Sequence, residues 1–268
     1  MLRRSIRFVQ SRVLAAMVVL TIAIAIPAAT VAAQTSSQQL VTAGDRESAA
    51  RRPAAALAQY EAALALDSMH YGALWRASRD AVDLGEAETD DAKRVQRYET
   101  AKLYATRAVA ANPHDAEGYF ALSRALGRIA LSVRVRERIK YAKDVRSNAL
   151  RALEFSPRHA GALHVMGVWN AEVMRLNGVA RAFAKTFLGG QVFGSASWSE
   201  ATRYMEQSVA ADPDRIVHRL DLARVYRDTK RIEDARTSYQ AAIRSRLLDG
   251  NDERYRRAAE AELRALNK

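Results

Sequence analysis

The chain of 268 residues contains no cysteine. This absence excludes disulfide bonds, thiol catalysis, thiolate metal ligands and lipid attachment through an N-terminal cysteine. Aromatic residues are also scarce, at 7% of the chain, although apolar residues make up 49%. The core must therefore be built mainly from alanine, leucine and valine, a composition that favours helices packed closely through small side chains.

Strand signals are missing as well. The five prolines and twelve glycines fall mostly between apolar stretches, and no run of alternating valine, isoleucine and threonine is long enough to propose a sheet. The sequence therefore predicts an all-α protein whose stability comes from packing alone.

Residues 1–33 differ from the rest of the chain. Four arginines within the first twelve residues precede an uncharged stretch over residues 13–26, and Pro27 and the small residues 31–33 follow it. This pattern is typical of a signal peptide, so we expect a leader over residues 1–33, a repeat domain over residues 34–268, and export, to the periplasm. An uncleaved membrane anchor is the alternative, because the uncharged stretch extends to residue 33 and a span needs about 20 apolar residues.

The formal net charge is +12, and without the four leader arginines 38 basic residues remain against 30 acidic ones. This balance favours anionic partners, such as an acidic peptide, an anionic phospholipid or a membrane surface. A merely soluble, arginine-rich surface is the alternative. An exported protein seldom meets nucleic acid, so we expect no nucleic-acid partner.

Four segments end in the same way, with an alanine-rich amphipathic stretch that stops at a short polar turn. They cover residues 60–68, 106–113, 149–157 and 206–213, and a second apolar stretch follows each turn. A unit of two helices used repeatedly makes a solenoid. The sequence predicts about five helical hairpins and a final helix over residues 252–266.

These units resemble the tetratricopeptide repeat, a 34-residue helix–turn–helix motif. In that motif small residues at positions 8, 20 and 27 let the two helices touch. The small positions of the first and last units hold Gly44, Ala56, Ala63, Ala223, Ala235 and Ala242. The resemblance implies a tetratricopeptide-like solenoid, a right-handed superhelix of about five repeats with insertions.

The spacing between successive turns exceeds 34 residues, at 45, 44 and 56. We expect the extra residues between the two helices of each unit, with residues 85–91 as one exposed loop. The longest insertion lies near residues 176–197, where Val179, Phe183 and Phe187 could plug the repeat core or touch a membrane. A capping box beginning at Ser197 then opens the next helix.

Between residues 141 and 263 the chain resembles the regulator of microtubule dynamics family. The resemblance rests on Tyr141-Ala-Lys-Asp-Val145, Gly161-Ala-Leu-His-Val-Met-Gly-Val-Trp169, Phe187-Leu-Gly-Gly190 and Trp198-Ser-Glu-Ala201. It implies a helical repeat domain; eukaryotic members sit at membranes and contact sites, and some are implicated in binding or moving phospholipids. A microtubule role is not expected of an exported chain.

The tetratricopeptide resemblance also implies a concave groove lined by the first helix of each unit. The positions that would line it are Trp75, Arg79, Phe120, Arg124, Arg128, His164, Leu220, Arg224 and Arg227. Aromatic and arginine side chains on one surface would supply apolar anchors and pair with carboxylates or phosphates. The alternative is that the aromatic residues belong to the core and the arginines to a solvated face.

A basic stretch follows the third unit's first helix. Its side chains are Arg134, Arg136, Arg138, Lys140, Lys143 and Arg146. A basic amphipathic helix can bind an anionic surface. It can equally be the solvent side of a repeat helix that packs Val145 and Leu150 inward.

Catalytic motifs are missing from the sequence. The five histidines form no metal-binding pattern, and neither a nucleophile elbow nor a phosphate-binding loop is present. We expect a non-enzyme without metal or cofactor. The predicted function is an exported scaffold that binds a protein or peptide partner in its groove, and the alternative is a phospholipid-binding or lipid-transfer module of the cell envelope.

Overall fold

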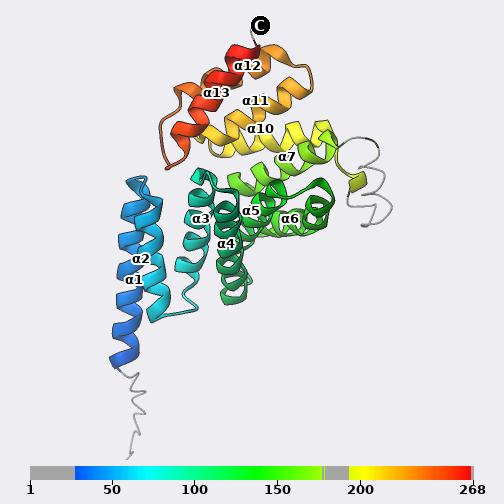
Figure 1. Cartoon of the computed structure of the whole chain (residues 1–268). Coiled ribbons are helices and arrows are strands. Elements are labelled where there is room, and N and C mark those ends of the chain that lie inside the picture. Colours follow the sequence, from blue (N-terminus) through cyan, green and yellow to red (C-terminus); the bar gives the residue numbers. More distant parts are fainter. Residues whose placement is uncertain (1–27, 177, 179–192, 267–268) are drawn as a thin grey trace, which may run out of the picture.

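The computed structural model describes residues 28–176, 178 and 193–266, and every regular element within them is helical (Figure 1). The helices are α1 (Ala28–Ala49), α2 (Pro53–Leu66), α3 (Tyr71–Ala87), α4 (Asp91–Ala111), α5 (Ala116–Ser132), α6 (Val135–Phe155), α7 (Ala160–Arg175), α10 (Trp198–Ala211), α11 (Ile216–Asp228), α12 (Ile232–Arg244) and α13 (Asp252–Leu266).

Consecutive helices pack as antiparallel hairpins, α1 with α2, α3 with α4, α5 with α6, α7 with α10 and α11 with α12. Figure 1 shows the hairpins stacked in chain order along a curved path, with α13 packed on the last of them. The predicted all-α solenoid of five hairpins and a final helix is confirmed, including the bounds of that helix.

The polar turns between units start the following helices. At three of them the side chain of His70, Asp115 or His159 accepts a backbone N–H two or three residues later, at 2.9–3.2 Å. Such caps satisfy donors that a helix leaves unpaired at its N-terminus. The predicted cap at Ser197 is also present, since its Oγ accepts the Glu200 N–H at 3.1 Å.

Small residues let the helices of a hairpin touch. A Cβ atom added to Gly44 would lie 2.4 Å from Cε1 of Tyr60, and one added to Gly85 would lie 2.5 Å from Cε1 of Tyr98. Tyr60 is fully buried and Tyr98 nearly so. Each tyrosine ring therefore occupies the space that a side chain on the opposite helix would need.

The predicted exposed loop over residues 85–91 is right only for residues 88–90, which connect α3 to α4, and is wrong for residues 85–87. Helix α3 continues to Ala87, and Gly85 and Glu86 are buried. The extra residues of the middle units lengthen the helices instead: α4 and α6 have 21 residues each, against 14 in α2 and α10. The helix continues because its last turn has tertiary partners, Tyr98 beside Gly85 and several polar groups around Glu86.

The N-terminal and longest-insertion predictions fall largely outside the described residues. Helix α1 begins at Ala28, so the expected boundary at residue 33 lies within a helix, and residues 1–27 are not described. The 176–197 connection joins α7 to α10, but Val179, Phe183 and Phe187 lie outside the described residues. Within the described ranges, no helix combines the length and the apolarity that a membrane span requires.

Candidate binding cavity

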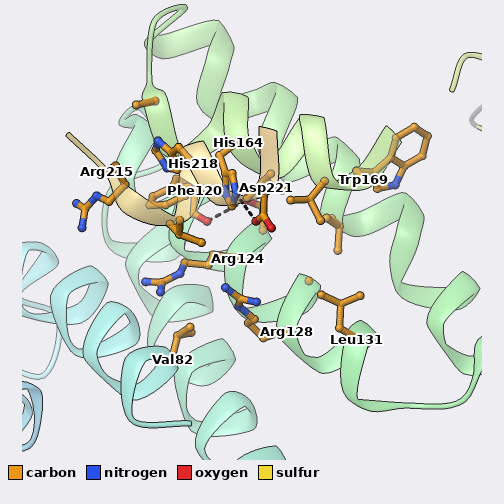
Figure 2. Close-up of a pocket in the computed structure, with 18 of the residues that line it drawn as sticks. Val82, Phe120, Arg124, Arg128, Leu131, His164, Trp169, Arg215, His218 and Asp221 are labelled. Atoms are coloured by element: carbon orange, nitrogen blue, oxygen red, sulfur yellow. Dashed lines mark hydrogen bonds and ion pairs between the residues drawn. The ribbon is translucent and has the colours of Figure 1, made fainter. Parts of the chain in front are cut away.

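The first helices of successive hairpins line an open cavity of about 810 Å³. Its walls come mainly from α3, α5, α7 and α11, with contributions from α6 and from the segment that leads into α13. Figure 2 shows charged side chains in the middle of this cavity, with Phe120 and Trp169 on either side of them. A volume of this size is in the range of about 300–1,000 Å³ that is typical of ligand sites.

Seven of the nine predicted groove residues line this cavity: Trp75, Arg79, Phe120, Arg124, Arg128, His164 and Arg224. The other two do not. Leu220 is only 1% exposed and belongs to the core of the last hairpin, because its side of α11 faces the neighbouring helices. Arg227 lies outside the cavity lining and is paired with Glu262 of α13 at 3.1 Å.

Glu86, which was predicted to lie in a loop, is surrounded by polar groups from α5, from α13 and from Asn251, which precedes α13. Its carboxylate pairs with Arg124 and Arg128 of α5, and it accepts hydrogen bonds from Asn251, Arg254 and Tyr255 at the C-terminal end of the chain. We call these six residues, with Asp83, the Glu86 cluster. Burial acts to raise the pKa of Glu86, but the charges of Arg128 and Arg124 outweigh burial. The pKa is therefore lowered, and the carboxylate stays charged.

The Glu86 cluster closes the solenoid on itself. The Asn251 side chain donates to the backbone carbonyl of Asp83 at 2.8 Å, although the two residues are 168 positions apart. Burial and the charge of Glu86 raise the pKa of Tyr255 well above its usual range, so its hydroxyl remains a donor to Glu86. The start of α13 therefore returns to α3 and completes the wall of the cavity, as the lower end of α13 in Figure 1 indicates.

A second group of charges joins α7, α11 and α13. His164 Nε2 lies 2.8 Å from Asp221 Oδ2, Arg224 Nη1 donates to Asp221 Oδ1 at 2.8 Å, and Arg224 also pairs with Glu262. Burial opposes the charged form of Asp221, but the hydrogen bond and charge of His164 and the charge of Arg224 hold its pKa well below the usual range. We call these four residues the Asp221 cluster.

His218 stacks on His164 with the ring centroids 4.6 Å apart. Burial lowers the pKa of His218 well below its usual range, and the neighbouring His164 and Arg215 lower it further. The imidazole is therefore neutral at physiological pH, and its buried Nδ1 has no hydrogen-bond partner among the described residues.

The cavity does not present an unopposed row of positive charge. Seven arginines and six carboxylates line it, and every one of these arginines forms a salt bridge. The pairs are Arg79–Asp80, Arg124–Asp83, Arg128–Glu86, Arg138–Glu172, Arg175–Asp228, Arg215–Asp249 and Arg224–Asp221. The groove arginines are thus fixed by internal partners, a feature that the sequence did not reveal.

One part of the wall is apolar. We call it the apolar compartment, and it consists of Leu131, Val165, Val168, Trp169, Val173 and Phe193. Trp169 stacks on Phe193 at 6.1 Å, and its Nε1 donates to the Ala142 carbonyl at 2.7 Å. Leu131 remains 37% exposed although it borders the cavity. The compartment therefore offers an apolar surface whose rings are already fixed in place.

The predicted basic helix is α6, and its charges divide between two environments. Arg138 faces the cavity and pairs with Glu172 at 2.9 Å, and Arg146 lies 5.6 Å from the Trp169 ring. Arg134, Lys140 and Lys143 are exposed, while the side chain of Arg136 lies outside the described part. Val145 packs inward, 6% exposed, as expected of a repeat helix with one solvated side.

Several residues in and around the cavity were missed by sequence reasoning. Asp83, Asp221 and His218 line it, and Glu86 pairs with two arginines that do. A usable signal existed on α3, where Asp80, Asp83 and Glu86 recur every three residues. That spacing makes successive carboxylates neighbours on the helix surface. No comparable signal pointed to Asn251 or Tyr255, because their partners lie more than 160 residues away.

The described residues contain no group of three histidine, aspartate or glutamate side chains that could hold a metal ion.

Stacked helical hairpins, small residues at the helix contacts and a lined concave face together define a tetratricopeptide-type solenoid. More specifically, the chain belongs to the family described as regulator of microtubule dynamics protein 1–3, whose model matches residues 35–267.

Two curated relatives match about half of the chain. Regulator of microtubule dynamics protein 1 of Mus musculus is 26% identical over 144 residues, which are 53% of this chain and 46% of the relative. The Bos taurus protein of the same name is 23% identical over 143 residues, 53% of this chain and 44% of the relative. The chain thus matches a little under half the length of each relative.

Among solved structures, a thermophilic tetratricopeptide-repeat protein of Thermus thermophilus is similar with a TM-score of 0.60. The sequences are 22% identical, and the match covers 84% of this chain and 99% of that one. This similarity supports the fold and confirms the predicted repeat class.

Proposed function

We propose that this protein is a scaffold that binds a short segment of a protein partner in the cavity, through an apolar anchor side chain and polar contacts. The observation that carries the proposal is the juxtaposition of the apolar compartment with the charged middle of the cavity. Large apolar anchors held in a preformed pocket supply most of the binding energy at protein interfaces.

The charged middle of the cavity favours a peptide over a phospholipid as the occupant. An acyl chain laid across Arg124, Arg128 and Asp221 would remove water from these charges without offering hydrogen bonds, which is costly. A peptide carries its own N–H and C=O groups and acidic side chains, so it can replace that water. We therefore include an acidic peptide among the proposed partners and treat the lipid as the alternative outcome of the test.

The test uses a side chain that fills the cavity. Gly127 lines the cavity, and a Cβ atom added there would meet only Val145 Cγ1, at 4.0 Å. Gly127→Phe should therefore project a ring into the space without disturbing the helix contacts. Gly194→Phe is the matched control, because Gly194 is exposed, has nothing within 4 Å and is not part of the cavity wall.

Random twelve-residue peptides displayed on phage would be selected against the chain, and the selected peptides measured by fluorescence polarisation. We expect the selected peptides to share a large apolar residue, and Gly127→Phe to weaken their binding at least tenfold while Gly194→Phe leaves it unchanged. Gly127→Leu serves in the same way if the phenylalanine variant unfolds. Equal peptide binding by both variants would contradict the proposal. So would a phospholipid that stays bound to the wild-type chain in native mass spectrometry and is lost only from Gly127→Phe.

Export is part of the same proposal and rests on the sequence pattern of residues 1–33. The expected result is a mature protein that lacks these residues when it is isolated from the cell envelope, with its mass measured by mass spectrometry. An intact N-terminus in the membrane fraction would instead support the anchored alternative, and an intact N-terminus in the soluble cytosolic fraction would contradict both.

A further inference from the structure

Arg124 and Arg128 differ from the other arginines of the cavity in how many of their donors are used. They lie four residues apart on α5 and therefore on one face of the helix. Only Nη2 of each guanidinium has a partner: that of Arg124 contacts Asp83 at 2.6 Å and Glu86 at 3.5 Å, and that of Arg128 contacts Glu86. Nε and Nη1 of both side chains have no partner among the described residues.

Two neighbouring arginines show what a fully occupied guanidinium looks like in the same cavity. Arg224 uses Nε and Nη2 on Glu262 and Nη1 on Asp221. Arg175 uses Nε and Nη2 on Asp228 and Nη1 on Glu172. A guanidinium has five N–H donors, so Arg124 and Arg128 each keep at least three available, whereas Arg224 and Arg175 each keep two.

The available donors are held in place and remain charged. The side chains of Arg124 and Arg128 are only 21% and 27% exposed, and both border the cavity near its middle (Figure 2). Burial acts to lower the pKa of each guanidinium, but Asp83 and Glu86 outweigh it for Arg124, and Glu86 does so for Arg128. The carboxylates of α3 thus orient the two arginines without using up their donors.

The charges around this pair favour an incoming anion. Glu86 is also paired with Arg254, so three arginines face the two carboxylates of Asp83 and Glu86. Asp221, the other carboxylate near Arg128, already has His164 and Arg224 as partners. An anion that enters between α5 and α11 therefore meets unused donors and a local excess of one positive charge.

We propose that the unused N–H groups of Arg124 and Arg128 form a subsite for a carboxylate side chain of the bound peptide. This inference rests on the proposed function and names the ligand class more closely: a segment in which an aspartate or glutamate lies near a large apolar residue. The apolar residue enters the apolar compartment, and the carboxylate replaces the water around the two arginines. Arg128 is then the residue that distinguishes an acid from its amide.

The chain offers a matched pair of variants. Arg128→Gln and Arg254→Gln each remove one arginine from Glu86, but only Arg128 lines the cavity. Glu86 keeps Arg124, Asn251 and Tyr255 as partners in both variants, so both should fold. Thermal melts followed by circular dichroism check this, and Arg128→Lys, which keeps the charge, replaces Arg128→Gln if that variant unfolds.

The probes are the peptides selected on the wild-type chain and copies in which each Asp or Glu is replaced by Asn or Gln, all amidated at the C-terminus. On the wild-type protein and on Arg254→Gln, we expect the amide copy to bind about tenfold more weakly than the acid. On Arg128→Gln the acid and the amide should bind within about twofold of each other, and on Arg128→Lys the difference should be intermediate.

Three results would overturn the subsite. One is an acid-to-amide ratio that stays at its wild-type value in Arg128→Gln. Another is an acid-to-amide ratio that falls as far in Arg254→Gln as it does in Arg128→Gln. The last is equal binding of the acid and the amide copies to the wild-type protein. In each case Gly127→Phe still reports on the cavity: if it abolishes binding, the proposed function stands and only the subsite is wrong, and if it does not, both fail.

Discussion

Helix α3 takes part in two contacts that are built in opposite ways. Toward α4, Gly85 leaves space that the Tyr98 ring fills, with a distance of 2.5 Å to an added Cβ, and no charge is involved. Toward α13, one residue further along, Glu86 is surrounded by two cavity arginines, an amide, a phenol and a third arginine. The first contact is local and steric, whereas the second spans the molecule and depends on charge.

The comparison shows what each kind of contact is for. Glycine and alanine at the helix contacts fix the hairpin, and any repeat of this class needs them. The Glu86 cluster instead joins units that are not neighbours in the chain, and it fixes the arginines that border the cavity. Specific polar contacts are costly to leave incomplete, so the second contact should be far more sensitive to loss of one side chain than the first.

The largest expected effect is that of Glu86→Ala. It leaves Arg124 and Arg128 buried with fewer partners and detaches the start of α13, and we expect it to lower the free energy of unfolding by about 3–5 kcal/mol. Urea denaturation measures this. Glu154→Ala removes the partner of Arg151 at the surface and should cost under about 1 kcal/mol. Similar losses in both variants would contradict the special status of the Glu86 cluster.

A smaller effect is expected at the local contact. Gly85→Ala places a methyl group against the buried Tyr98 ring, and overpacking of this kind costs about 1–3 kcal/mol. Gly127→Ala is the control with the opposite sign: its Cβ meets nothing closer than 4.0 Å, so the better helix propensity should stabilise the protein by about 0.5–1 kcal/mol. The same sign for both variants in urea denaturation would show that steric closeness does not govern this contact.

The smallest expected effect concerns Asp80, which precedes Asp83 and Glu86 on α3. Burial raises the pKa of Asp80 to about 6, although Arg79 acts in the opposite direction, and its Oδ2 has no partner among the described residues. Because the folded pKa lies above the unfolded value of about 3.9, the stability that Asp80 contributes is fully present below about pH 4 and is lost as the pH rises through about 6.

Asp80→Asn removes this pH-dependent cost. The variant should match the wild type near pH 4 and exceed it by about 1–2 kcal/mol near pH 8, as measured by the difference between their urea midpoints at the two pH values. A difference that shrinks with rising pH would mean that the contact with Arg79 matters more than burial.

The sequence predicted those parts of the structure that depend on neighbouring residues. The hairpins, the cap at Ser197 and the final helix from Asp252 all follow from local patterns, and the structure confirms them. Residues 85–91 were interpreted as a loop because Gly85 and several acidic residues cluster there. The helix persists through Ala87 because Tyr98 and the Glu86 cluster provide contacts that the local sequence does not contain.

For the candidate site too, the sequence predicted what the repeat pattern determines and missed what depends on distant contacts. The repeat register identified Phe120, Arg124 and Arg128 as cavity residues, because position within a repeat determines which face a residue occupies. It misassigned Leu220 to the groove, since helix α11 packs that side against its neighbours. It could not reveal that the arginines are paired, because the carboxylates that pair with them come mostly from other helices.

The closure through Glu86 changes how a solenoid of this type unfolds. In an open repeat array each unit contacts only its neighbours, so the ends fray first and stability is a sum of local terms. Here Asn251, Arg254 and Tyr255 contact a residue 165 to 169 positions earlier. The entropy cost of closing so long a loop is met only when α13 meets the second hairpin. The last helix and the second hairpin are thus released together, so opening becomes a collective event that begins at the contact between α3 and α13.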